Sequence, residues 1–408
     1  IPAVKKDAES DEYLADAEIT LYANRDIYNY AGEVIVNAGT KLETVTTDKN
    51  GKAQFTLDLP NDFTPSDAVM PITDTSFDVN VVGDVRLIGD TNSLFYAKET
   101  KAPVGYASGQ ETRYYFDTRY TDQEKAVLSF AAEYQNEPIK VEISKTDITT
   151  GEELPGATLQ IKNEANKVIE EWVSTDKPHT FEKLPVGNYI LSEKLPAAGY
   201  ITAKDIPFEV KDTGEIQKVV MEDDVTKLQI IKTDENGNLR AGNKLAIFDV
   251  NENLLDTWVS ADQPHDITKL TVGQEYILRE LEAAPGYTKA EDVRFIVRDT
   301  PEVQVVNMSN KQTEMTFQKV DETGKPLAGA KLEVISPKNR SIIDQWTRTG
   351  EPHTIQYLVE GEKYILREVA APYGYELAKE IEFIAKDGGA IVMENQPIIT
   401  KVQVNKVD

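Results

Sequence analysis

A short block with one tryptophan and one histidine recurs three times along this chain. It reads WVSTDKPH, WVSADQPH and WTRTGEPH, so each histidine follows its tryptophan by seven residues. The tryptophans, which are 86 and 88 residues apart, are Trp172, Trp258 and Trp346. The histidines are His179, His265 and His353. A unit of that length is a small domain and not a solenoid repeat of about 20–50 residues. The sequence therefore predicts tandem domains of one fold.

Three more positions recur with the same period. A lysine opens a K-x-D step, a glutamate lies in YILSE or YILRE, and an Asp or Asn falls two residues after a methionine. These positions hold Lys145, Glu193 and Asp223 in the first copy, Lys232, Glu280 and Asn310 in the second, and Lys319, Glu368 and Asn395 in the third. The separation from the lysine to the Asp or Asn is identical in the first two copies and two positions shorter in the third. A set kept at such spacing predicts a shared site in each domain.

Residues 1–137 have the same pattern in a longer form. Lys5 opens KKDAESDEYLADAEITLY, which aligns without gaps with the stretch that starts at Lys145, and Lys6 is its competitor for the lysine position. Glu99 lies in YAKETKAPVGY, and Asn136 lies nine residues before the next lysine of the column. The lysine-to-glutamate spacing is 94 residues here and 48 in the next two copies, so this domain carries about 46 extra residues.

These columns divide the chain into domains at residues 1–137, 138–225, 226–312 and 313–400. Residues 401–408 then read as the start of a further repeat, because Lys406 lies 87 residues after Lys319. The chain also begins at Ile1 without a methionine. We expect a piece of a longer parent protein.

The repeats read as strands, which predicts an all-β fold of Ig-like or prealbumin-like sandwiches in an elongated array. VEISK, KLQIIK and MTFQK alternate apolar and polar residues, and Gly, Pro and Asn-Gly steps interrupt such segments every 8–12 residues. Asn50-Gly51 between KLETVTT and AQFTLDL predicts a hairpin turn. DQEKAVLSFAAEY fits either a short helix or a last strand.

Alternation also places the charged columns inside the domains. Lys145 shares a strand face with Val141 and Ile143, and Glu193 shares one with Leu191, so both side chains point inward. Burial favours a neutral amine, which is a nucleophile, and a protonated carboxyl group, which can shuttle protons. Such an amine could attack a neighbouring Asn side chain to form an isopeptide bond and ammonia, or an Asp side chain to form the same bond and water. The alternative is a buried salt bridge without a covalent bond.

Composition excludes many other functions. Without cysteine the chain has no disulfides, zinc–thiolate sites, iron–sulfur clusters or thiol nucleophiles, and with a net charge of −26 it repels nucleic acid and anionic membranes. Only three histidines are present and no apolar run reaches about 18 residues, so we expect no metal site and no membrane span. No P-loop, nucleophile elbow, HExxH or Rossmann pattern appears, so we expect neither an enzyme with turnover nor a cofactor.

The pattern K-x-D…L-x-G-A…Y-x-L-x-E-x-x-A-P-x-G-Y…N resembles the CnaB-type, SpaA-like prealbumin-fold domains of Gram-positive surface proteins and pilins. LPGATL, PLAGAKL, APVGY and APYGY carry this resemblance, which covers residues 141–400 well and residues 1–137 in outline. Two residues depart from the family pattern. One is Asp223, and the other is Asn243, where the neighbouring copies have Ala157 and Ala330.

The resemblance implies an intramolecular isopeptide bond in each domain, formed without an external enzyme. The implied bonds are Lys5–Asn136, Lys145–Asp223, Lys232–Asn310 and Lys319–Asn395. The implied catalytic acids are Glu99, Glu193, Glu280 and Glu368. The family also contains Lys–Asp bonds, which accommodates Asp223.

The resemblance further implies an extracellular stalk or adhesin segment that is anchored to a Gram-positive cell wall. Sortase and peptidoglycan would act on parts of the parent outside this chain, and a protein or glycan of a host or neighbouring cell would be the ligand. One alternative is a sortase-polymerised pilin subunit, although the pilin motif around Tyr-Pro-Lys is absent. The other is a carbohydrate-binding module array in which the three tryptophans are the sugar-binding platforms. The competing interpretation of the Trp–His pairs is a packing role.

Overall fold

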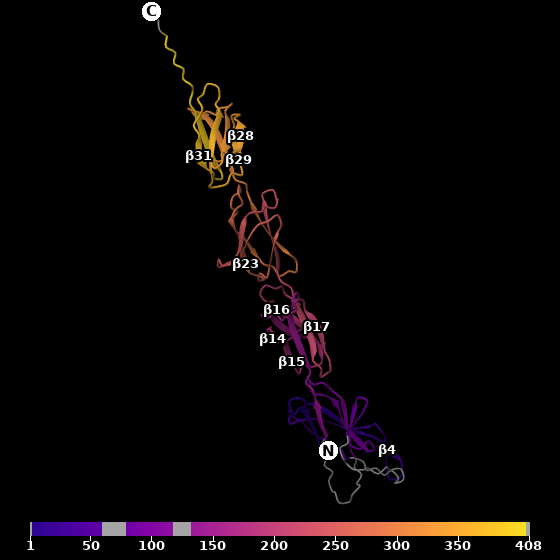
Figure 1. Ribbon diagram of the computed structural model, residues 1–408. Coiled ribbons are helices and arrows are strands. Elements are labelled where there is room, and N and C mark those ends of the chain that lie inside the picture. The colour runs from indigo at the N-terminus through magenta and orange to yellow at the C-terminus, as the bar shows by residue number, and fades with distance from the viewer. Residues whose placement is uncertain (1, 59–78, 117–131, 405–408) are drawn as a thin grey trace, which may run out of the picture. The chain divides into compact units, whose positions relative to one another are not determined.

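The computed structural model of this chain describes residues 2–58, 79–116 and 132–404, and all regular structure in these ranges is β-strand (Figure 1). Within them, no helix is long and apolar enough to cross a membrane. The chain forms two compact units, Ile1–Ala197 with Thr202–Asp224 and Ala198–Ile201 with Val225–Asp408. We describe each unit by itself and keep the names domain one to domain four for residues 1–137, 138–225, 226–312 and 313–400.

Domain one, in the first unit, has a three-stranded sheet of order β11-β1-β6, a six-stranded sheet of order β5-β2-β9-β10-β8-β7 and a small β3-β4 pair. Its strands are β1 (Pro2–Asp7), β2 (Glu18–Ala23), β3 (Ile27–Tyr28), β4 (Val34–Val36), β5 (Lys41–Thr46), β6 (Lys52–Gln54), β7 (Val79–Val82), β8 (Val85–Ile88), β9 (Phe95–Lys101), β10 (Glu111–Phe116) and β11 (Ala132–Asn136). Strands β3, β4, β7 and β8 have no counterpart in the other domains, so the extra residues lengthen one sheet and add a ribbon.

Domain two completes the first unit with sheets of order β15-β12-β18 and β14-β13-β16-β17. Its strands are β12 (Lys140–Asp147), β13 (Thr158–Asn163), β14 (Val168–Val173), β15 (His179–Glu182), β16 (Gly187–Leu195), β17 (Ile206–Val210) and β18 (Gln217–Asp223).

Domains three and four, in the second unit, repeat this topology. Domain three contains β19 (Lys227–Asp234), β20 (Lys244–Asp249), β21 (Leu254–Val259), β22 (His265–Thr268), β23 (Glu275–Glu282), β24 (Val293–Ile296) and β25 (Gln304–Asn310). Domain four contains β26 (Glu314–Asp321), β27 (Lys331–Ile335), β28 (Ile342–Thr347), β29 (His353–Gln356), β30 (Lys363–Ala370), β31 (Ile381–Ile384) and β32 (Gly389–Asn395).

Each domain is a sandwich because alternate residues of both sheets point into one core. In domain three, Leu228 and Met308 of one sheet pack with Leu245, Ile247 and Leu278 of the other. Each such buried side chain contributes roughly 1.5–3 kcal/mol relative to an exposed one. The all-β sandwich prediction is confirmed.

The first and last strands of each domain lie side by side and parallel, although they come from opposite ends of the domain's sequence. In domain two, β12 pairs with β18 so that Lys145 lies opposite Met221 and Asp147 lies opposite Asp223. Asp223 is therefore two residues along from the partner of Lys145 and on the same face. The same register recurs in the other domains.

The predicted hairpin at Asn50-Gly51 is wrong. Strand β5 before it pairs with β2, whereas β6 after it pairs with β1, so the turn carries the chain from one sheet to the other. Gly51 has φ +63°, and a Cβ there would lie 2.5 Å from the Lys5 carbonyl oxygen, so the close approach of β1 requires glycine. Of the DQEKAVLSFAAEY stretch, the last three residues belong to strand β11 and the others lie outside the described residues.

Candidate functional site

The column lysine is buried in every domain, although it is a charged residue. Its side chain follows two apolar residues on the inner face of the first strand, and the pleat carries it into the core. These lysines are Lys5, Lys145, Lys232 and Lys319, and none is more than 3% exposed. In domain one the structure distinguishes the two candidates, because Lys6 points outward and pairs with Glu133 at 3.3 Å.

A β-bulge positions the column glutamate. In domain three the pairing of β20 with β23 runs from Leu245 opposite Glu280 to Lys244 opposite Glu282, which leaves Leu281 without a partner residue. The same shift follows the glutamate in the other three domains. A bulge redirects a side chain locally. Here the bulged residue directly follows the glutamate whose side chain enters the core.

In domain three this glutamate contacts both the lysine and the asparagine. Lys232 Nζ lies 3.3 Å from Glu280 Oε1, and Asn310 Nδ2 donates to Glu280 Oε2 at 2.9 Å and to the Thr288 carbonyl at 2.6 Å. Ala290 N–H also donates to Glu280 Oε2 at 2.6 Å. Among the described residues, Asn310 Oδ1 has no hydrogen-bond partner, and Lys232 Nζ is held by its ion pair with Glu280. The amine and the carboxamide are thus held at one buried carboxyl group.

Domain four has the same arrangement. Lys319 Nζ lies 3.4 Å from Glu368 Oε1, and Asn395 Nδ2 donates to Glu368 Oε2 at 3.1 Å and to the Glu376 carbonyl at 2.9 Å. Ala378 N–H donates to the same glutamate at 2.8 Å. The two domains differ in sequence around the site but agree in its contacts.

Domain one keeps the triad in a slightly more open setting. Lys5 Nζ lies 3.0 Å from Glu99 Oε1, and Asn136 Nδ2 donates to Glu99 Oε2 at 2.9 Å. The side chain of Glu99 is 12% exposed, whereas that of Glu193, its counterpart in domain two, is fully buried. The extra strands of this domain thus leave the triad intact.

Domain two differs because it places two carboxyl groups on one amine. Lys145 Nζ lies 3.0 Å from Glu193 Oε1 and also contacts Asp223 Oδ1 directly. Ala203 N–H donates to Glu193 Oε2 at 2.6 Å, as the corresponding alanines do in domains three and four. Burial raises the pKa of Asp223 to about 7, although the nearby Lys145 opposes this shift.

Burial also shifts the pKa values of four other groups of the triads toward their neutral forms. It lowers the pKa of the amines of Lys5, Lys232 and Lys319, and it raises the pKa of the Glu99 carboxyl group. A neutral amine beside a protonated carboxyl group carries the same number of protons as the ion pair, so moving one proton interconverts the two. The site can therefore present a nucleophile and an acid without exchange with solvent.

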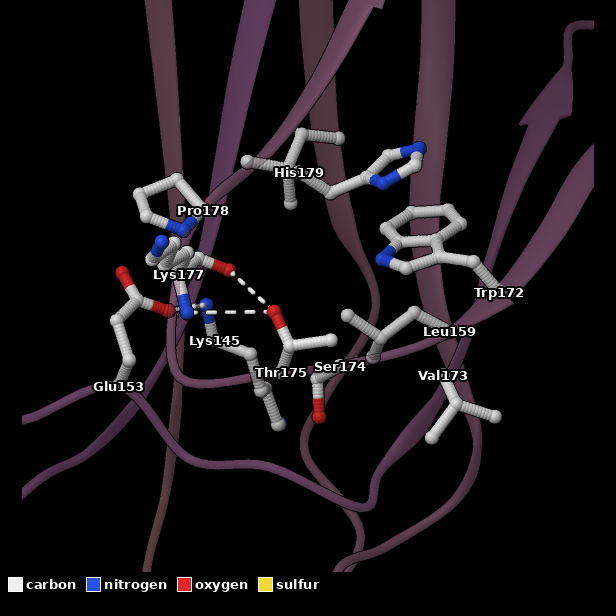
Figure 2. Close-up of a pocket in the computed structure, with 11 residues that line it drawn as sticks. Lys145, Glu153, Leu159, Trp172, Val173, Ser174, Thr175, Lys177, Pro178 and His179 are labelled. Atoms are coloured by element: carbon white, nitrogen blue, oxygen red, sulfur yellow. Dashed lines mark hydrogen bonds between the residues drawn. The ribbon is translucent and has the colours of Figure 1, made fainter.

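The Trp–His pairs lie where edge strands of the two sheets meet, and in domain two Lys145 lines the same cavity as Trp172 and His179. In domain two, Trp172 of β14 stacks on His179 of β15 (Figure 2). Their ring centroids are 4.8 Å apart, and both residues line a cavity of about 40 Å³. The stacks in domains three and four have centroid distances of 4.2 Å. Each histidine also faces a carboxylate of the tryptophan's strand, Glu170 in this case at 3.3 Å. Because each stack joins strands of different sheets, this geometry favours the packing interpretation.

The sequence did not reveal the bulge, nor the alanine N–H that binds the glutamate in domains two, three and four. The bulged residue is Thr100, Lys194, Leu281 or Val369, so it has no common side chain. The alanine was detectable by spacing, since it follows the glutamate by ten residues in three domains. Its N–H is a backbone group, however, and residue type alone does not reveal it.

The comparison with family models agrees with this fold. A model of the SpaA prealbumin-like fold domain matches residues 139–225, 226–312 and 313–397. Among solved structures, the Bacillus anthracis TIE protein is 18% identical, with 97% of this chain and 73% of that chain covered and a TM-score of 0.43. BcpA, the major pilin subunit of Bacillus cereus, is 11% identical, with 64% and 99% covered and a TM-score of 0.33. A Streptococcal ancillary pilin is 16% identical, with 64% and 98% covered and a TM-score of 0.28. No curated protein sequence matches the chain.

The three matched segments cover more than half of the chain and coincide with three of its four sandwiches. Domains of this kind are structural and not enzymatic. The chain belongs to the family of SpaA prealbumin-like fold domains.

Proposed function

We propose that this chain is a structural stalk or adhesin segment of a Gram-positive cell-surface protein, and that each of its domains closes its own Lys–Asn or Lys–Asp isopeptide bond. One observation supports the proposal above all: in all four domains a buried amine and a buried side-chain carbonyl group meet at one glutamate. Sortase would anchor the parent protein through parts outside this chain, and the ligand would be a protein or glycan on a host or neighbouring cell.

The reaction in domain three would use only the groups at hand. The Lys232 ammonium gives a proton to Glu280, and the neutral amine attacks Cγ of Asn310. Glu280 then returns this proton to Nδ2 and accepts a second proton from Nζ. The Cγ–Nδ2 bond breaks, and ammonia leaves with Glu280 protonated. The product is an Nζ–Cγ amide. In domain two the same attack on the protonated Asp223 carboxyl group would release water.

Such a bond would explain why a cysteine-free protein can serve as a stalk. It closes a loop from Lys232 to Asn310, which is nearly the whole of domain three. If the entropy behaves as for a disulfide, the gain is roughly 4–5 kcal/mol per domain. Because the first and last strands are adjacent and parallel, a pull on the two ends of a domain would pass through the crosslink and leave most of the domain folded.

The test is the intact mass of the purified chain under denaturing conditions. We expect a mass below the sequence mass by three molecules of ammonia and one of water. The variant Lys145→Ala should lose ammonia three times and no water. Lys6→Ala, next to Lys5 but outward-facing, is the matched control and should keep all four losses. An unmodified mass equal to the sequence mass would refute the covalent proposal and leave four buried ion pairs.

A further inference from the structure

A turn that ends in Gly-Tyr follows each column glutamate, and in domains one and three it approaches the next domain closely. In the first unit, a Cβ on Gly105 of domain one would lie 2.4 Å from the Lys183 carbonyl oxygen of domain two. In the second unit, a Cβ on Gly286 of domain three would lie 2.9 Å from the Tyr357 carbonyl oxygen of domain four. Both glycines have φ +84°. Backbone meets backbone here, so neither contact can yield by a rotamer change.

The residue on the other side of this contact is itself in an unusual conformation. Lys183 follows β15, Tyr357 follows β29, and both have φ +64°, which is uncommon for residues with side chains. Their side chains cover the tyrosine of the turn: Lys183 Nζ lies 5.2 Å from the Tyr106 ring centroid, and the Tyr357 ring meets the Tyr287 ring edge to face at 5.7 Å. The left-handed conformation thus presents a carbonyl group to the glycine and a side chain to the tyrosine.

The linker residue between the two domains is bound on both sides. Thr313 N–H donates to the Gly286 carbonyl at 3.0 Å, and the Thr313 carbonyl accepts from Tyr357 N–H at 3.0 Å. Its hydroxyl donates to the Leu358 carbonyl at 2.6 Å. Ile139 makes the same two backbone bonds in the first unit, to Gly105 at 3.0 Å and from Lys183 at 2.8 Å. Both linker residues are at most 1% exposed. A linker held this way has little freedom to bend.

The fourth copy of the turn provides the contrast. Gly374 in domain four has φ +88°, yet a Cβ there would meet nothing within 4 Å. Ile398 donates to its carbonyl at 2.8 Å as the linker residues do, but Ile398 is 56% exposed. The conformation of the turn therefore belongs to the domain itself, and the close contact arises only where a following domain packs on it.

We propose that the Gly-Tyr turn and the left-handed residue of the following domain form a joint that fixes the orientation of domain two on domain one and of domain four on domain three. The joint makes no use of the lysine triads, so it stands whether or not the isopeptide bonds form. The joint restricts the motion of the two consecutive domains relative to each other. The chemistry it requires is a glycine on one side and a bulky residue with positive φ on the other.

The test uses the absence of cysteine from this chain, because spin labels then attach only where cysteines are introduced. Val305→Cys on β25 and Val392→Cys on β32 place labels on exposed strand positions of domains three and four. In the full chain, a fixed joint gives one narrow distance distribution between the labels. Gly286→Ala should broaden it, whereas Gly374→Ala, with matching backbone strain and no neighbour, should leave it unchanged.

A second variant keeps both turns intact. Thr313→Val removes the hydroxyl bond to the Leu358 carbonyl but preserves the shape of the linker residue, so it should broaden the distribution without lowering the unfolding temperature of either domain. An unchanged distribution in both Gly286→Ala and Thr313→Val would overturn the joint. Equal broadening by Gly286→Ala and Gly374→Ala would do so too, since strain alone would then explain the effect.

Discussion

Domains two and three share the same lysine and glutamate geometry but differ in the third member of the triad. In domain three, Asn310 gives one NH group to Glu280 and another to the Thr288 carbonyl. In domain two, Asp223 cannot donate while it is ionised and contacts the amine instead. Both sites are buried, so the contrast is one of proton count and not of solvent access.

This contrast shows what the third position controls. A site with one amine, one carboxyl group and a neutral amide is electrically balanced by a single ion pair. A second carboxyl group adds a charge that burial disfavours, which is why the pKa of Asp223 rises to about 7. The final amide would be the same in both domains. The two domains should therefore differ before the bond forms, in how bond formation and stability depend on pH.

The largest expected effect comes from removing the amine. Lys145→Met and Lys232→Met each abolish the crosslink, so each should cost its own domain roughly 4–5 kcal/mol of unfolding free energy. Hydrogen exchange measured by mass spectrometry during a denaturant titration of the full chain reports each domain separately. Lys218→Met removes an amine that is 70% exposed on β18 and pairs with Glu142, and it should cost at most about 1 kcal/mol.

The same measurement can break the comparison. If Lys145→Met costs domain two no more than Lys218→Met does, while Lys232→Met keeps its large effect, then domain two holds an ion pair and only domain three is crosslinked. Equally large losses of unfolding free energy in Lys145→Met and Lys232→Met would mean that both domains are crosslinked.

A second, smaller effect should appear in the pH dependence of bond formation. The carboxyl carbon of Asp223 is electrophilic only in the protonated group, and its pKa is about 7. The rate in domain two should therefore fall roughly tenfold per pH unit above about pH 7. Chain made by cell-free synthesis and transferred to buffers from pH 5 to pH 9 would show this as loss of water over time by intact mass. Asp223→Asn should remove this dependence on the third residue, and a pH-independent rate in the parent would contradict the mechanism.

Before the bond forms, the stability of domain two should also depend on the protonation of Asp223. The folded pKa of Asp223 lies above its ordinary value of 3.8, so between about pH 4 and pH 7 the folded domain binds more protons than the unfolded one. The contribution of this group to stability is then full below about pH 4 and is lost as the pH rises through about 7. Fresh domain two should thus be more resistant to proteolysis at pH 5 than at pH 8 until the bond forms.

The sequence predicted the members of each triad because strands have a fixed period of two. Knowing that Val141 and Ile143 face the core is enough to place Lys145 there, and the recurrence of the column identifies its partners. Fold class follows from the same alternation. No contact had to be known in advance, since the column recurs in every domain and its spacing is nearly constant in domains two to four.

What the sequence could not predict depends on local backbone geometry. The bulge beside Glu280 has no residue signature, because Leu281 contributes only its extra length to the strand. Asn-Gly is a residue pair that favours a hairpin turn, but β6 joins the sheet of β1 because it pairs with β1. This tertiary pairing cannot be read from the residues of the turn. The joint at Gly286 needed the φ angle of Tyr357, and a tyrosine gives no hint of a left-handed conformation.

The smallest expected effect concerns a departure outside the triad. Asn243 in domain three stands where domains two and four have alanine; it is buried, donates to the Ser260 hydroxyl at 3.0 Å, and accepts from the buried Ala284 N–H at 2.8 Å. Asn243→Ala makes domain three resemble its neighbours at this position but leaves that N–H without its acceptor. We expect a loss of about 1–2 kcal/mol in domain three alone. The intact mass deficit should stay the same, because the side-chain hydrogen bonds of Asn243 go to Arg240, Ala241, Ser260 and Ala284 and to no triad residue. A lost ammonia deficit in Asn243→Ala would show that bond formation depends on this loop as well as on the triad, and the contrast between domains two and three would then have a second cause.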